Sequence, residues 1–262
     1  MAILNADQSV DTRALPELEP ITGDTYNPIT MQGAYVHGPS DIHYRFGDND
    51  IDMPGTYVFA GGVVVSGPMS SITVLRSGNP AYSITGLSAP IENLWADAQD
   101  NGKLDTFPAS IFSGDDTLNG SPFDDVLFAF AGNDTIDAGK GDDTLSGGPG
   151  QDDLFGRGGK DVFVFADTLG AANADNIMDF KHKKDSIFLD KDIFPAVGVK
   201  VGKKEYFEGK KAHDGNDHII RKGNKLFYDD DGKGGDKQVL FAKVTKNAVI
   251  DHHDFTVGDL VI

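Results

Sequence analysis

An aspartate recurs every nine residues through the middle of the chain. The series is Asp116, Asp125, Asp134, Asp143, Asp152 and Asp161. Two positions after these aspartates stand the apolar residues Leu118, Leu127, Ile136, Leu145, Leu154 and Phe163, and two positions before them stand Gly114, Phe123, Gly132, Gly141, Gly150 and Gly159. A fixed short period indicates a repeat architecture, because an acidic linker has no need of a regularly spaced apolar residue. The carboxylates are therefore candidate ligands of a cation.

The nine-residue row predicts a glycine-rich turn followed by a short strand. Two rows form one right-handed coil of parallel strands, so that rows eighteen residues apart stack and their apolar residues pack inside. Stacked carboxylates repel one another unless a cation lies between them. Ca²⁺ takes roughly six to eight oxygen ligands in flexible geometry. Mg²⁺ requires a tighter octahedron, and Zn²⁺ prefers His or Cys, which these turns lack. The rows thus favour calcium.

The row resembles the G-G-x-G-x-D-x-U-x calcium-binding nonapeptide repeat of RTX proteins. The resemblance implies an ion between turns eighteen residues apart, bound by both aspartates and by carbonyls two and four residues before the first and three and five before the second. Asp143 and Asp161 then use the carbonyls of Gly139, Gly141, Gly156 and Gly158, and Asp134 and Asp152 use those of Phe130, Gly132, Gly147 and Pro149. A third site pairs Asp116 with Asp134 and uses the carbonyl of Gly114. A fourth pairs Asp125 with Asp143 and uses the carbonyls of Ser121 and Phe123. The roll is thus expected to hold about four ions.

The segment after the repeats resembles the closing strands of RTX rolls. Alternating apolar residues predict strands in "VFVF" and "SIFL", which would cover the edge of the last coil. Residues 224–244 predict two strands joined by an acidic turn. Asp229, Asp231 and Asp236 are candidates for another Ca²⁺, but Leu240 stands where an EF-hand needs an acid, so a solvated hairpin turn is favoured.

The first 110 residues predict a β-rich region. Strand-like runs at 41–46, 56–67, 71–78 and 81–87 are separated by turn signals, and residues 91–104 predict a short helix. We therefore expect an all-β protein with four parts. These are a flexible lead (1–25), a β-sandwich-like N-terminal domain (26–110), a parallel calcium-binding β-roll (111–165) and a C-terminal β cap (166–262).

Charge and terminal sequences bear on partners and location. The net charge is −18, residues 111–161 hold 11 acidic and 3 basic residues, and cysteine is absent. We therefore expect no nucleic-acid partner, and we expect no membrane span because no long apolar run occurs. The N-terminus has no basic region followed by an apolar run. The C-terminal "DHHDFTVGDLVI" resembles the uncleaved signal of type I export substrates, which implies a secreted, extracellular bacterial protein that uses the type I secretion machinery.

Two functions remain open. The first is a non-enzymatic secreted protein whose roll folds on extracellular Ca²⁺ and presents a β-domain to a cell surface, matrix or polysaccharide. Its candidate contact residues are Tyr35, Tyr44, Tyr57 and Tyr82, although a place in the core is more typical of such tyrosines. The alternative is a small secreted hydrolase or lyase with an unrecognised active site, although neither His-Glu-x-x-His nor Gly-x-Ser-x-Gly occurs.

Isolated histidines and acids offer weaker candidates. His37, His43 and the neighbouring aspartates of residues 41–52 are more typical of a polar loop than of a metal or acid–base site, and "GDNDID" at 47–52 is a second candidate calcium loop. His252 and His253 are predicted to be surface residues.

Overall fold

The computed structural model describes residues 112–233 and 238–260 throughout and, before residue 112, the backbone of eight strands. The described residues are almost entirely strands and turns, with two 3₁₀ turns, η1 (Ala171–Asn173) and η2 (His252–Asp254). The prediction of an all-β protein is confirmed. Within the described residues, helices never reach the length and apolar character that crossing a membrane requires.

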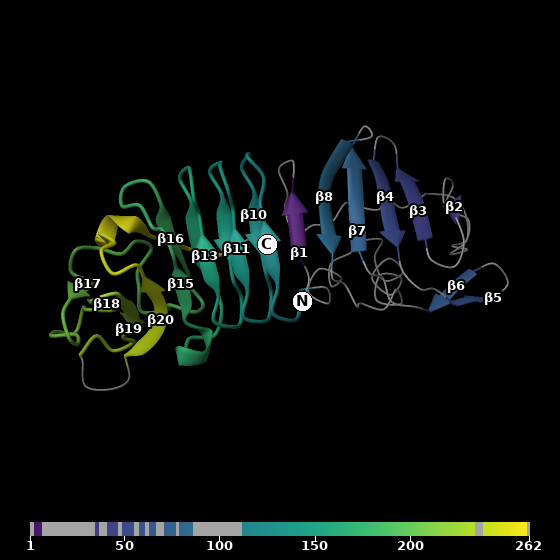
Figure 1. The fold of residues 1–262 in the computed structure, drawn as a ribbon. Coiled ribbons are helices and arrows are strands. Elements are labelled where there is room, and N and C mark those ends of the chain that lie inside the picture. The colour runs from purple at the N-terminus through teal and green to yellow at the C-terminus, as the bar shows by residue number, and fades with distance from the viewer. Residues whose placement is uncertain are drawn as a thin grey trace.

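The repeat rows form the two walls of a parallel β-roll (Figure 1). One wall contains β9 (Thr117–Asn119), β11 (Thr135–Asp137) and β13 (Asp153–Phe155). The other contains β10 (Val126–Phe128), β12 (Thr144–Ser146) and β14 (Val162–Phe165). Strands two rows apart pair in parallel, so each coil takes eighteen residues.

The apolar residue of each row fills the interior of the roll. Leu118, Ile136 and Leu154 lie opposite one another in register on one wall, and Leu127, Leu145 and Phe163 do so on the other. All six side chains are fully buried. A three-residue strand allows only one inward position, so one apolar residue per row is enough to build this core.

The roll continues past the repeats into the closing strands. β15 (Asp175–Ile177) pairs with β13, β16 (Ser186–Asp190) pairs with β14, and β21 (Phe255–Gly258) pairs with β16, all in parallel. The predicted strands in "VFVF" and "SIFL" are therefore present.

The cap consists of four further strands beyond β15. They are β17 (Tyr206–Glu208), β18 (Ile219–Lys222), β19 (Lys225–Tyr228) and β20 (Val239–Val244). β19 and β20 form the expected antiparallel hairpin, and β20 pairs in parallel with β15. Phe194 packs edge-on against Tyr228 and Phe241, with ring centroids 5.2 Å apart in both pairs, so aromatic side chains close this end of the core.

The N-terminal strands extend one wall of the roll (Figure 1). β1 (Ile3–Ala6) pairs in parallel with β9 and antiparallel with β8 (Asn79–Thr85). Beyond β8 come β7 (Ser71–Arg76), β4 (Asn49–Pro54), β3 (Asp41–Phe46) and β2 (Tyr35–Val36). β5 (Val58–Ala60) and β6 (Val63–Ser66) form a separate antiparallel pair.

The expectations about this region have different outcomes. The strands predicted at 41–46 and 71–78 correspond to β3 and β7. Residues 49–52, which are part of the candidate calcium loop at 47–52, belong to β4 and pair with β3 and β7. The helix predicted at 91–104 lies outside the described residues, and the four domain boundaries stay a prediction.

Candidate metal centre of the roll

Each aspartate of the nine-residue series lies directly before a strand of the roll. All six carboxylates are buried, with exposures of 3% at Asp116, 2% at Asp125 and Asp134 and 0% at Asp143, Asp152 and Asp161. They form two columns, Asp116–Asp134–Asp152 and Asp125–Asp143–Asp161. The predicted aspartates are thus brought together, and the eighteen-residue coil is what aligns them.

Backbone-to-carboxylate hydrogen bonds link each column. The N–H of Asp116 donates to Oδ1 of Asp134 (2.6 Å), and that of Asp134 to Oδ1 of Asp152 (2.7 Å). In the second column the N–H of Asp125 donates to Oδ1 of Asp143 (2.8 Å), and that of Asp143 to Oδ1 of Asp161 (3.2 Å). One oxygen of each acceptor carboxylate is thereby held toward the preceding coil.

The columns continue through two aspartates that the nine-residue period did not reveal. The N–H of Asp152 donates to Oδ1 of Asp175 (3.2 Å), and that of Asp161 to Oδ1 of Asp185 (3.3 Å). The separations are 23 and 24 residues instead of 18, so the connections are longer and break the period. A signal was nevertheless present, because Ile177 and Ile187 keep the apolar residue two positions after the aspartate.

The second oxygen of the central aspartates lacks a hydrogen-bond partner. Oδ2 of Asp134, Asp143, Asp152 and Asp161 is buried and accepts no hydrogen bond. An unsatisfied buried carboxylate oxygen costs free energy, and repeated orphan oxygens indicate a missing partner. A cation that accepts oxygen ligands meets that need.

Burial raises the pKa of these carboxyl groups toward neutrality. For Asp134 and Asp143 the pKa rises to about 7, chiefly by desolvation, and like-charged aspartates in adjacent coils add to the effect. Desolvation likewise raises the pKa of Asp152 and Asp161 to about 6. At the end of one column, burial and the Asp152 charge raise the pKa of Asp175 to about 9. The metal-free columns therefore resist full ionisation.

Glycines let adjacent turns approach closely. Gly139 (φ +99°) and Gly141 (φ +121°) have left-handed backbones that side chains disfavour. A Cβ at Gly139 would lie 2.7 Å from the carbonyl oxygen of Ser121, and one at Gly141 would overlap that of Phe123. These turns thus stack carbonyl against backbone, with no room for a side chain.

The predicted carbonyl ligands lie in the same stack of turns. A Cβ at Gly132 would overlap the Gly114 carbonyl oxygen, and one at Gly148 would overlap that of Phe130. At Gly147 and Gly156 it would lie 2.5 Å and 2.8 Å from Cγ of Asp152 and Asp161 respectively.

Three of those carbonyls accept backbone hydrogen bonds between stacked turns. They are the carbonyls of Gly139, Pro149 and Gly158, which accept from Gly158, Gly132 and Gly141 respectively. The predicted carbonyl ligands therefore belong to the same stack of turns as the aspartates, and a set of carboxylate and carbonyl oxygens fits Ca²⁺.

One row departs from this pattern. Ser121 donates to both oxygens of Asp125, through its N–H to Oδ2 (2.6 Å) and its hydroxyl to Oδ1 (3.1 Å). Phe123 stands where other rows have glycine, and it is 57% exposed. The Asp125 carboxylate is therefore held by its own turn, unlike those of Asp143 and Asp161.

The other candidate sites fare differently. Asp229 is fully buried, and its Oδ1 accepts from the N–H of Gly232 (3.0 Å). The β19–β20 turn was expected to be solvated, and this residue departs from that expectation. Asp231 is exposed, and Asp236 lies outside the described residues. The side chains of His37, His43 and the four N-terminal tyrosines also lie outside them.

A protein-family model agrees with the geometry of the repeats. The model of the RTX calcium-binding nonapeptide repeat (4 copies) matches residues 111–145 and 129–163. A solution structure of the AlgE6R3 subunit from the Azotobacter vinelandii mannuronan C5-epimerase is similar over 55% of this chain and 78% of that chain, with 24% identity and a TM-score of 0.39. Among curated proteins, none matches. Residues 111–163 are RTX calcium-binding nonapeptide repeats, folded as a parallel β-roll.

Proposed function

We propose that this is a secreted, non-enzymatic protein whose β-roll folds when it binds extracellular Ca²⁺. The observation that carries the proposal is the set of buried, unsatisfied Oδ2 atoms at Asp134, Asp143, Asp152 and Asp161. Because ions must replace the missing partners, folding and calcium binding become one equilibrium.

Each ion is held between turns one coil apart. Asp143 and Asp161 with the carbonyls of Gly139, Gly141, Gly156 and Gly158 form the best-formed site. Asp134 and Asp152 with Phe130, Gly132, Gly147 and Pro149 form its counterpart in the other column. The Asp116–Asp134 and Asp125–Asp143 pairs complete the rows, and the latter is the weakest because Ser121 already occupies Asp125.

The columns also extend to Asp175 and Asp185. Both carboxylates accept the N–H of the last repeat aspartate in their column, as the repeat aspartates themselves do. Each column therefore offers one further place for an ion at the closing strands.

Calcium dependence suits export of an unfolded chain. In the cytosol calcium is scarce, so ionised columns repel and the roll stays open; outside, affinities of ~10⁻⁴–10⁻³ M suffice. Phe255 in β21 is 1% exposed and β21 pairs with β16, so folding hides part of the C-terminal segment. The type I machinery would therefore read this segment before the roll closes.

The roll then presents the N-terminal strands to a cell surface, matrix or polysaccharide. The support is the pairing of β1, which joins β9 of the roll to β8 of the N-terminal sheet. When calcium orders the roll, β9 becomes available to pair in parallel with β1. Folding of the roll would therefore help to order the N-terminal strands.

Far-UV circular dichroism during calcium titration tests the proposal. The metal-free chain should gain β signal cooperatively with Ca²⁺ near the millimolar range but not with Mg²⁺, and the Asp143→Ala, Asp161→Ala variant should need more Ca²⁺. The matched control is Asp142→Asn, because Asp142 is an exposed neighbour and asparagine can still accept the Lys160 N–H. A chain that is fully folded without calcium, with a variant that changes nothing, would overturn the proposal.

The enzymatic alternative falls on residues 26–110. Their side chains lie outside the described residues, so no observation favours a hydrolase or lyase site there.

A further inference from the structure

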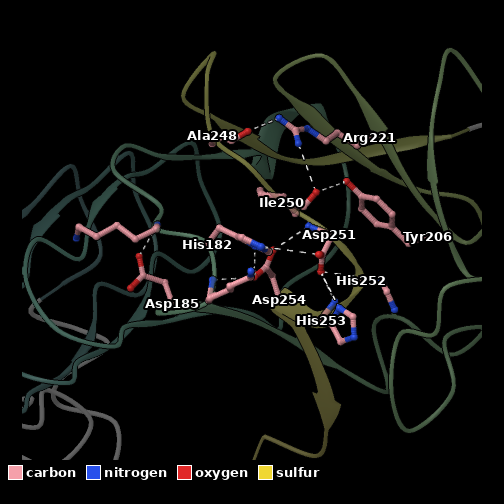
Figure 2. A network of polar contacts seen from close by, with 12 residues as sticks. His182, Asp185, Tyr206, Arg221, Ala248, Ile250, Asp251, His252, His253 and Asp254 are labelled. Carbon is pink, nitrogen blue, oxygen red and sulfur yellow. Dashed lines mark hydrogen bonds and ion pairs between the residues drawn. The ribbon is translucent and has the colours of Figure 1, made fainter.

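A second polar cluster lies away from the aspartate columns, at the start of β21 (Figure 2). It joins His182, in the turn between β15 and β16, to the segment Asp251–Asp254. The two parts are 72 residues apart at His182 and Asp254, so only the folded chain assembles the cluster. The calcium columns do not use these residues.

Asp254 fixes the orientation of His182. Nδ1 of His182 lies 2.9 Å and 2.8 Å from the two carboxylate oxygens of Asp254, whose side chain is 2% exposed. Facing two oxygens that only accept, Nδ1 is the hydrogen-bond donor, which leaves Nε2 as the ring nitrogen that can bind a metal ion. Asp254 also accepts from the N–H of Asp251 (2.7 Å), which holds the carboxylate in place. A buried carboxylate behind a histidine is a common outer partner of a metal-ligating imidazole.

Nε2 of His182 faces Oδ2 of Asp251 across 3.8 Å (Figure 2). That separation is too long for a hydrogen bond. Two ligand atoms of a tetrahedral Zn²⁺ site lie about 3.4 Å apart, given metal–ligand bonds of about 2.0–2.2 Å. The spacing is therefore close to what one ion between the two atoms needs.

Two more imidazoles flank the other side of Asp251. Nδ1 of His253 forms a hydrogen bond with Oδ1 of Asp251 (3.1 Å), which leaves its Nε2 to bind an ion, and Nδ1 of His252 lies 4.0 Å from the same oxygen. The ligand atoms of these three residues lie within 4.8 Å of one another. The prediction of surface histidines holds for His253, which is 68% exposed, but His252 is only 23% exposed.

We propose that this cluster is a binding site for a transition-metal ion of the Zn²⁺ class. His182 Nε2 and Asp251 are the ligands on one side of the site, and Asp254 is a positioning residue. His252 and His253 form a second group with Asp251 and would turn toward the ion to supply the remaining imidazoles. Imidazole nitrogens with one carboxylate suit Zn²⁺, whereas the roll turns, which have only oxygen donors, suit Ca²⁺. The protein therefore carries two kinds of metal site with different ligand chemistry.

The proposed ion would fasten the last strand to the roll. The turn that carries His182 is closed by Asp185, which accepts the N–H of Lys181 (2.7 Å), and Asp185 also ends one aspartate column. Zn²⁺ would tie that turn to the residues that lead into β21. Because the cluster forms only in the folded chain, zinc should bind after calcium and should stabilise the calcium-loaded state.

Zinc titration of the full chain in saturating Ca²⁺ tests the site, because calcium then occupies the oxygen-only turns. Calorimetry with ZnCl₂ should show a bound ion, and the thermal midpoint should rise with Zn²⁺ but not with added Mg²⁺. The paired variant His252→Ala, His253→Ala and the single variant His182→Gln should each weaken Zn²⁺ binding at least about tenfold. Lys203→Ala, a change at an exposed residue elsewhere in the cap that lies in no group of metal-ligating side chains, should leave it unchanged.

The positioning role of Asp254 has its own readout. Asp254→Asn should weaken Zn²⁺ binding about 10- to 100-fold and alter the visible absorption of bound Co²⁺, with the calcium midpoint unchanged. Circular dichroism in saturating Ca²⁺ confirms that each variant is folded, and the paired histidine variant keeps the test decisive if His182→Gln unfolds the cap. Failure of the wild-type chain to bind Zn²⁺, or equal binding by it and the folded paired variant, would overturn the site without touching the calcium proposal.

Discussion

Replacing Asp143 by asparagine should affect the metal-free and calcium-loaded roll in opposite directions. Asp143 is fully buried, and desolvation raises its pKa from 3.8 to about 7. At about 1.4 kcal/mol per pKa unit, this corresponds to at most about 4 kcal/mol of destabilisation of the ionised metal-free fold above pH 8, because solvent screening reduces the effect. Asn removes the charge yet keeps an oxygen that can accept the Asp125 N–H. The stability of the metal-free fold should therefore rise by up to that amount.

The sign of this effect depends on pH. A carboxyl whose folded-state pKa is raised stabilises the metal-free fold below its unfolded pKa, and that contribution is lost as pH rises through the folded value. The wild-type metal-free chain should therefore lose β signal as pH rises from about 4 through 7. Asp143→Asn should keep its β signal to higher pH, and at pH 5 it should differ less from the wild type.

The assay is far-UV circular dichroism of chelator-treated protein across this pH range, followed by calcium titration at about pH 8. Asn lacks the charge that draws the ion, so the calcium midpoint of the variant should rise severalfold. Asp142→Asn is the matched control, since Asp142 is exposed and accepts the Lys160 N–H (2.8 Å) from the next coil. If Asp143→Asn loses β signal at the wild-type pH, or keeps the wild-type calcium midpoint, the buried-charge account is wrong.

Three further outcomes follow from the same roll. Calcium affinity should rise between about pH 5 and 8, because ions displace protons from carboxyls with pKa values of about 6 and 7; a flat profile by calorimetry would contradict this. Gly141→Ala should raise the calcium midpoint, since its Cβ would overlap the Phe123 carbonyl, whereas Gly170→Ala, which meets nothing within 4 Å, should not. Leu145→Ala should lower the free energy of unfolding of the calcium-loaded protein by about 2–5 kcal/mol in urea melts, and Val199→Ala, at a 95% exposed position, should change it little.

The pairing of β1 bears on how the roll begins. Ile3–Ala6 supplies a parallel partner for β9, so the first coil on that wall does not end as an open edge. The closing strands protect the other end. That wall is therefore bounded at both ends by strands from outside the repeats, whereas the other wall begins at β10.

The nine-residue period by itself determined the architecture of the roll. Each row is one turn and one short strand, and its inward residue and its aspartate are fixed by local spacing, so Leu145 and Asp143 could be placed from the sequence alone. The same reasoning aligned the two aspartate columns, because parallel stacking preserves register between rows eighteen residues apart.

Only the tertiary structure decided where the columns end and what lies beyond them. Asp175 and Asp185 join the columns after connections of 23 and 24 residues, so the period no longer marks them. His182 meets Asp254 across 72 residues, a contact that no local pattern encodes. Short-range periodicity determines the strand register and the stacking of neighbouring rows. Contacts between distant segments depend on how the closing strands pack on the finished roll.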